Sequence, residues 1–186
     1  MMELSPGRAW PLSRGDGRPL TRLWMGLGWD PLPYEVGTAT PQVDLDATAV
    51  QFGGGKPVDI AFYNHRATGD GSVQLLGDNR TGLHEGDDET IEIDLDRTHP
   101  DVDTILFLVT SYQGHIIEWI RNAYCRLIDE DGVELARLTI TGGGPHTGVV
   151  LAKVVRAGDE WQLHPVGEGV SITIPIESVD ELARFL

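Results

Sequence analysis

The residues best suited to bind a ligand lie in one acidic stretch, residues 70–89. It contains six carboxylates, one asparagine and four glycines, and Arg80 is its only cation. Carboxylates this close together repel one another unless they stay in water or share a bound cation. Glycines beside the acids favour a chain that turns tightly around an ion and offers its carbonyls to it. The stretch predicts a cation site, and the alternative is an acidic surface loop in water.

The donor types in this stretch narrow the choice of ion. Carboxylate, amide and backbone oxygens suit a hard cation, and Ca²⁺ accepts six to eight oxygens in looser geometry than Mg²⁺ does. The stretch is not an EF-hand, because Arg80 stands two residues after Asp78, where that loop needs its second ligand. We therefore expect Ca²⁺ in a loop of another kind.

Composition excludes several classes of protein. The 186 residues carry a formal charge of −15 with only two lysines, which argues against binding to nucleic acid. Residues 70–103 hold eleven acids and two arginines, so −9 of that charge surrounds the expected ion. The single cysteine, Cys125, excludes an internal disulfide, and no apolar stretch is long enough to cross a membrane. We expect one soluble, cytoplasmic domain.

The elements that must hold the acidic stretch are short strands separated by turns. Thr104–Val109 is almost wholly apolar and predicts a central strand buried on both faces. Residues 178–186 predict a short helix with a capping box of Ser178 and Glu181. Nine or ten strands at this spacing predict an all-β fold, a two-sheet β-sandwich with the acidic loop at one end. Besides short apolar segments in residues 3–19, the expected strands are residues 20–27, 43–52, 58–63, 90–95, 104–109, 122–128, 133–140, 149–156 and 160–166.

A second pair of acids lies on the strand expected at residues 43–52. With a period of two, Asp44 and Asp46 share one face, about 6.5 to 7 Å apart, within reach of one ion. A solvated strand face explains the same pattern equally well. The Asp-Gly pair at 131–132 is also acidic, but that dipeptide is favoured in hairpin turns for backbone reasons, and we expect a turn there.

Eight short motifs occur in collinear order along nearly the whole chain. They are GLGWD (26–30), DLDAT (44–48), FYN (62–64), DGSV (70–73), GDNRTG (77–82), EGDDE (85–89), NAYCRL (122–127) and EWQLHPVGEG (160–169). In this combination the sequence resembles the TerD family of tellurite-resistance and general stress proteins. The resemblance implies one TerD-like domain over residues 1–186, with a core of about 3–169 and a C-terminal strand and helix extension at 170–186.

The resemblance also implies a β-sandwich that binds two Ca²⁺ ions and acts in resistance to tellurite and other chemical stress. By position, the implied metal ligands are side chains of the acidic stretch, with the two acids of the earlier strand as further candidates. They are Asp70, Asp78, Asn79, Asp87, Asp88 and Glu89, with Asp44 and Asp46.

Three kinds of function fit these residues. The first is a calcium-dependent binding or scaffold protein that serves unidentified protein partners, among them other stress-system proteins. The second is a peripheral membrane adaptor in which loop-bound Ca²⁺ takes a lipid phosphate and Leu83 inserts. The third, a metal-dependent hydrolase with His65 or His84 as proton shuttle, has little support, because the six histidines lack zinc-type spacing and no GxSxG occurs. We expect a protein that is not an enzyme.

Overall fold

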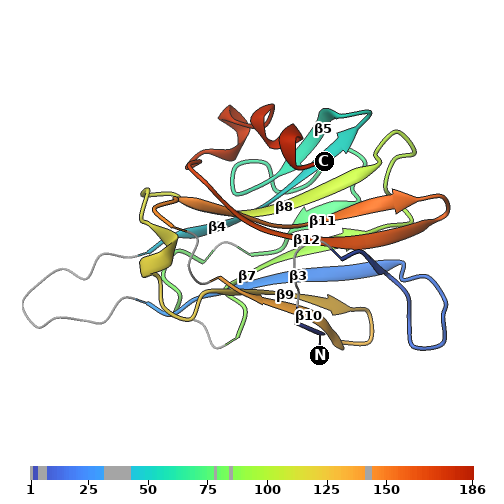
Figure 1. Cartoon of the computed structure of the whole chain (residues 1–186), viewed down its shortest axis with the longest axis horizontal. Coiled ribbons are helices and arrows are strands. Elements are labelled where there is room, and N and C mark those ends of the chain that lie inside the picture. The colour runs from blue at the N-terminus through green and yellow to red at the C-terminus, as the bar shows by residue number, and fades with distance from the viewer. Residues whose placement is uncertain (1, 4–7, 32–42, 78, 84–85, 141–143) are drawn as a thin grey trace, which may run out of the picture.

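Two six-stranded sheets face each other in the computed structural model, which describes residues 2–3, 8–31, 43–77, 79–83, 86–140 and 144–186 (Figure 1). The β3 sheet has the order β1-β10-β9-β3-β7-β6, and the β4 sheet has the order β2-β12-β11-β8-β4-β5. All neighbours within the sheets are antiparallel except β1 and β10. The strands are β1 Met2–Glu3, β2 Trp10–Pro11, β3 Arg22–Gly28, β4 Leu45–Gly53, β5 Lys56–Ala61, β6 Val73–Leu75, β7 Glu89–Asp94, β8 Thr104–Ser111, β9 Tyr124–Asp129, β10 Glu134–Thr139, β11 Gly148–Ala157 and β12 Glu160–Val170.

The main hydrophobic core lies between the two sheets. The β3 sheet contributes the inward side chains of alternating strands, such as Leu23, Leu27, Ile91 and Ile93, all of them buried. Their polar neighbours point outward, because successive side chains of a strand face opposite sides. The predicted two-sheet β-sandwich is thereby confirmed at the level of an all-β fold of two packed sheets.

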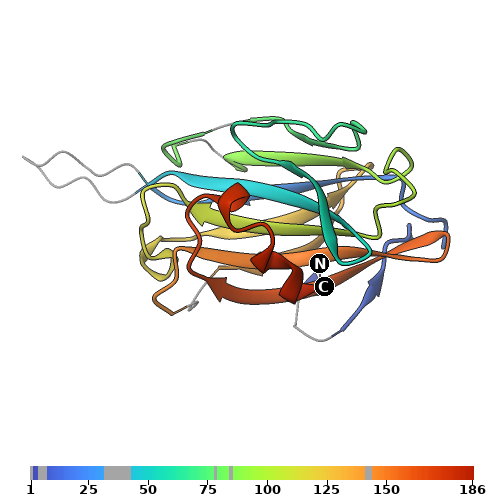
Figure 2. The same ribbon diagram turned by 90° about the horizontal axis from the view of Figure 1, so that it is seen from above.

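The outer face of the β4 sheet is covered by the C-terminal segment. Val50, Leu106 and Leu108 form a second apolar cluster there with Leu182 and Phe185. This cover explains why β8 is buried along its whole length, as its apolar sequence predicts. Figure 2 shows the C-terminal turns lying across the strands of this sheet.

The C-terminal strand and α-helix expected after residue 169 are replaced by two 3₁₀ turns, η2 at Pro175–Glu177 and η3 at Glu181–Phe185. No side chain caps η3, so the predicted capping box is wrong. So short a segment has little helical stability of its own, and packing decides its form. Leu182 and Phe185 are three residues apart, and the 3₁₀ turn places both against the sheet.

The segment between β5 and β7 is not one open loop. It contains β6, which pairs with β7 and which the sequence analysis missed because the strand is only three residues long. A short 3₁₀ turn, η1, lies at Ile117–Trp119, between β8 and β9. The Asp-Gly turn between β9 and β10 is confirmed: the Asp129 carboxylate accepts hydrogen bonds from the Asp131 and Val133 amides.

Candidate metal site

Five of the eight predicted ligand residues gather at one end of the sandwich, where β4 and β7 begin (Figure 1). Asp44 and Asp46 enter β4, Asp88 and Glu89 enter β7, and Asn79 comes from the preceding loop. The four carboxylates are each no more than 8% exposed. Burial on this scale excludes the solvated strand face that the sequence left open for Asp44 and Asp46.

The side chains of Asp88 and Glu89 accept hydrogen bonds at this end, and the bond to Glu89 ties the two sheets together. Asp88 accepts from the Trp29 amide at 3.0 Å and from the Asn79 side chain at 2.8 Å. Glu89 accepts from the Ala47 amide at 2.6 Å. The Ala47 amide is available because the pairing of β4 with β5 begins only at Ala49. The site therefore lies at the end of β4 that does not pair with β5.

Asp44 and Asp46 line a pocket of about 200 Å³, with Arg80 facing the same space. Two tyrosines and an asparagine complete its wall, namely Tyr63, Asn64 and Tyr112. Burial raises the pKa of Tyr63, and the nearby negative charge of Asp46 raises it further. The sequence analysis gave these wall residues no role, although the FYN motif contains two of them.

Three glycines allow the close approaches around this end. A Cβ at Gly26 would lie 2.2 Å from an Asp87 oxygen, and one at Gly28 would lie 2.6 Å from the Tyr124 ring. Gly82 has φ +64° and sits against the indole of Trp29. That indole donates to the Val43 carbonyl at 3.0 Å, directly before Asp44. The GLGWD and GDNRTG motifs are thus explained by packing around the acids.

Asp70 does not join this group. Its carboxylate accepts a hydrogen bond from Gln51, which lies five residues beyond Asp46 on β4, roughly 16 Å along the strand. It also accepts from the Ser72 and His99 amides and from the Thr68 and Ser72 hydroxyls. Burial raises the pKa of Asp70, but these donors outweigh it and leave the pKa well below its usual range. Asp70 organises its own loop.

Asp87 also points away from the group, onto the outer face of the β3 sheet. Its carboxylate is held by Arg126 at 2.8 Å and by the Tyr124 hydroxyl at 3.0 Å. The bond to Asp87 raises the pKa of Arg126, as expected for a charge-assisted pair. The acids of residues 70–89 therefore do not all face one site, because the Asp87 and Asp88 side chains point to opposite sides of the chain.

Asp78, Glu85 and His84 lie outside the described residues. Within the part of the chain that the structure describes, no three acidic, histidine or cysteine side chains are close enough to hold an ion together. The donor chemistry nevertheless suits a hard cation, because Asp44, Asp46, Asp88, Glu89 and Asn79 offer only oxygen ligands besides one amide nitrogen. In this arrangement the Arg80 guanidinium is the cation that lines the pocket.

Comparison with known proteins decides the family. The model of the TerD domain matches residues 1–175 of this chain. The chain belongs to the TerD domain family. It is 34% identical to the tellurium resistance protein TerZ of Serratia marcescens, over 90% of this chain and 89% of that protein. It is 31% identical to the stress response protein SCP2 of Bacillus subtilis, over 92% of this chain and 94% of that protein.

A solved structure has the same fold. A crystal structure of a homologue of the telluride resistance protein TerD from Streptomyces coelicolor superposes with a TM-score of 0.76 at 22% identity. The match covers 88% of this chain and 98% of that one. The resemblance deduced from the motifs is confirmed, and with it membership of a tellurium-resistance and general stress protein family. Among the described residues, no helix is long and apolar enough to cross a membrane.

Proposed function

We propose that this protein is a calcium-dependent binding module of the stress response, in which Ca²⁺ stabilises the acidic end of the sandwich. The observation that carries the proposal is the burial of Asp44, Asp46, Asp88 and Glu89 at that end. Taking a carboxylate out of water costs several kcal/mol unless a positive charge or hydrogen bonds compensate it. Two of these carboxylates, Asp44 and Asp46, line the pocket with one arginine, Arg80, so its lining carries a net negative charge that favours a cation.

Calcium suits the site better than magnesium for geometric reasons. The candidate ligands come from β4, β7 and the loop between β6 and β7, and Asp78 in that loop adds another carboxylate. Ca²⁺ tolerates the irregular geometry that separate segments provide, whereas Mg²⁺ demands a near-ideal octahedron. At a hundredfold excess over its dissociation constant, such an ion adds about 2.7 kcal/mol to folding stability.

Calorimetric titration tests this proposal. The protein is expected to bind Ca²⁺, with two ions implied by the family resemblance, and to bind Mg²⁺ more weakly. Asp46→Asn keeps the shape of the side chain and should lower calcium affinity at least tenfold. Asp101→Asn is the matched control, because that carboxylate is 86% exposed and lies outside the site. Equal calcium affinity in the two variants would refute the assignment of Asp46.

We further propose that the protein acts by binding and not by catalysis. Burial raises the pKa of the Cys125 thiol to about 12, so this cysteine is not a nucleophile in the folded chain. The His65 ring lies 3.3 Å from Asp59 on the exposed surface, away from the buried carboxylates. A hydrolase would instead show turnover of a phosphoester panel that disappears in Asp88→Ala.

A second candidate, recruitment to a membrane surface through Ca²⁺, is favoured by exposed apolar side chains at the same end. Leu83 is 73% exposed and Trp119 is 69% exposed. Their loops leave the sandwich on the side where β4 and β7 begin (Figure 1). Exposed tips beside a calcium site match the requirements of an insertion loop, since a bound ion would offset the repulsion between two negative surfaces.

Sedimentation with phosphatidylserine vesicles distinguishes the two candidates. A membrane adaptor sediments with the vesicles only when Ca²⁺ is present, and the double variant Leu83→Ser, Trp119→Ser stays in the supernatant. A plain scaffold protein stays in the supernatant in both conditions. Val133→Ser is the control, because Val133 is also exposed but lies in the hairpin between β9 and β10.

A further inference from the structure

A second cavity lies under the C-terminal turns, on the outer side of the β4 sheet. Its volume is about 270 Å³, or roughly nine times the volume that one water occupies in the liquid. Its floor is apolar: Val170, Ile172, Leu182 and Phe185 line it, and all four are buried. A cavity of this size and lining accommodates a small organic molecule and is smaller than a pocket for a drug-sized ligand.

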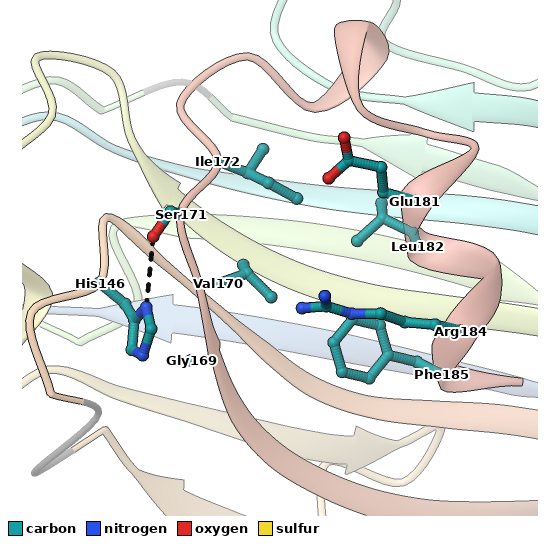
Figure 3. A pocket seen from close by; sticks show the side chains of 9 residues that line it. All are labelled: His146, Gly169, Val170, Ser171, Ile172, Glu181, Leu182, Arg184 and Phe185. Carbon is teal, nitrogen blue, oxygen red and sulfur yellow. Dashed lines mark hydrogen bonds between the residues drawn. The ribbon is translucent and has the colours of Figure 1, made fainter.

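Polar groups stand around this floor on opposite sides. The Arg184 guanidinium lies over the Phe185 ring, 4.7 Å from its centroid. Figure 3 shows it on one side of Val170, with His146 and Ser171 on the other. The His146 Nδ1 atom lies 3.4 Å from the Ser171 hydroxyl. Glu181 also lines the cavity, but its carboxylate points toward Ile172, away from His146. The groups that face one another across the floor are therefore a cation, an imidazole and a hydroxyl.

We propose that this cavity binds a small amphipathic carboxylate, of roughly ten non-hydrogen atoms. Its carboxylate pairs with Arg184, whose planar guanidinium matches a carboxylate in two parallel hydrogen bonds. Its apolar part packs against the floor beside Val170 and Phe185. Because these side chains are already buried, the gain comes from removing the ligand's own apolar surface from water. His146 and Ser171 contact the ligand's carboxylate on the side opposite Arg184.

This site is separate from the calcium proposal and lies partly beyond the family match. Four of its lining residues follow residue 175, where the match to the TerD domain ends; they are Glu181, Leu182, Arg184 and Phe185. None of its lining residues belongs to the acidic end. Binding here is therefore expected to proceed in the presence of a calcium chelator.

The experiment is a titration of the full chain with benzoate and hexanoate, followed by amide chemical shifts in a chelator-containing buffer. Benzamide and hexanamide are the matched uncharged probes. The acids should shift the Val170 and Phe185 amides in a saturable way, and the amides should bind at least tenfold more weakly. Arg184→Gln should weaken binding of the acids about tenfold or more, since it removes one charge-assisted contact. Arg18→Gln is the control, because that arginine is an exposed residue paired with Asp16.

Three results would overturn the inference. They are an absence of saturable shifts with either acid, equal binding of acid and amide, and equal binding in Arg184→Gln and Arg18→Gln. Glu181→Gln tests the charge of the ligand. It should bind the acids at least as well as the wild type does, because it removes a negative charge that lines the same cavity. An unchanged melting temperature shows that each variant is folded.

Discussion

Replacing Asp70 with alanine removes the acceptor that organises the turn before β6. The donors that lose their partner are the Ser72 amide and hydroxyl, the Thr68 hydroxyl, the Gln51 side chain and the His99 amide. Gln51, Thr68 and Ser72 are buried, so water cannot readily replace the carboxylate. Each unsatisfied buried donor costs about 1–3 kcal/mol, and some of these groups keep a second contact. We expect the free energy of unfolding to fall by about 3–5 kcal/mol.

The pH dependence of this loss follows from the lowered pKa of Asp70. A carboxyl group with a lower pKa in the folded chain contributes its full stability above its unfolded pKa, near 4. That contribution disappears as the pH falls through the folded pKa. The stability difference between wild type and Asp70→Ala should therefore be largest at neutral pH and should shrink below about pH 4.

Urea unfolding followed by tryptophan fluorescence, in the presence of a chelator, measures the loss without any contribution from calcium. Asp101→Ala is the control and should change stability by less than about 0.5 kcal/mol. In the same Asp70→Ala protein, calcium affinity should stay within a few fold of wild type, because Asp70 lies away from the buried carboxylates. A stability loss below about 1 kcal/mol, or a folded variant that no longer binds calcium, would refute the structural role of Asp70.

Three further perturbations test other parts of the structure. Gly82→Ala puts a methyl group 2.6 Å from the Trp29 indole at a φ of +64°. We expect the free energy of unfolding in urea to fall by about 1–3 kcal/mol and calcium binding to weaken. Wild-type values of both would contradict the packing argument. Phe185→Ala removes a buried ring from the cover of the β4 sheet and should cost about 3 kcal/mol, checked by thermal melting against the exposed Leu186→Ala. Cys125, whose thiol pKa is about 12, should react with a thiol reagent at pH 8 only at the rate of unfolding, and rapid labelling of the native protein would show that it is accessible.

The strand pattern was predictable because it depends on local alternation. In β4, Val43, Leu45 and Ala47 alternate with Asp44 and Asp46, and the structure puts the first set in the main core and the acids on the other face. β8 was equally clear from its continuous apolar run. The alternation of apolar and polar residues does not show which other segment of the chain covers a strand. The cover over β8 comes from residues more than 70 positions later in the chain.

The candidate site was predictable in part. The motifs drew attention to the acids, and the structure buries Asp44, Asp46, Asp88 and Glu89, while their binding of metal stays a prediction. The division of the acidic stretch was not predictable, because it depends on partners that are distant in sequence: Arg126 for Asp87 and Gln51 for Asp70. Local charge density gives no information about such long-range pairs.

In the C-terminal segment a local sequence signal was present but predicted the wrong structure. A capping pattern was present in residues 178–186, yet the structure forms a 3₁₀ turn there. Propensity decides little in so short a segment, and the spacing of Leu182 and Phe185 on the sheet decides its form. Nothing in the sequence indicated that Arg184 and Phe185 line a pocket.

A crystal structure of the calcium-saturated protein tests the central claim most directly. It is expected to show an ion with oxygens of Asp44, Asp46 or Asp88 at roughly 2.3–2.6 Å, the usual range for Ca²⁺. The claim would be contradicted by a calcium-saturated crystal in which no ion lies within that distance of these carboxylates and each keeps only protein or water partners.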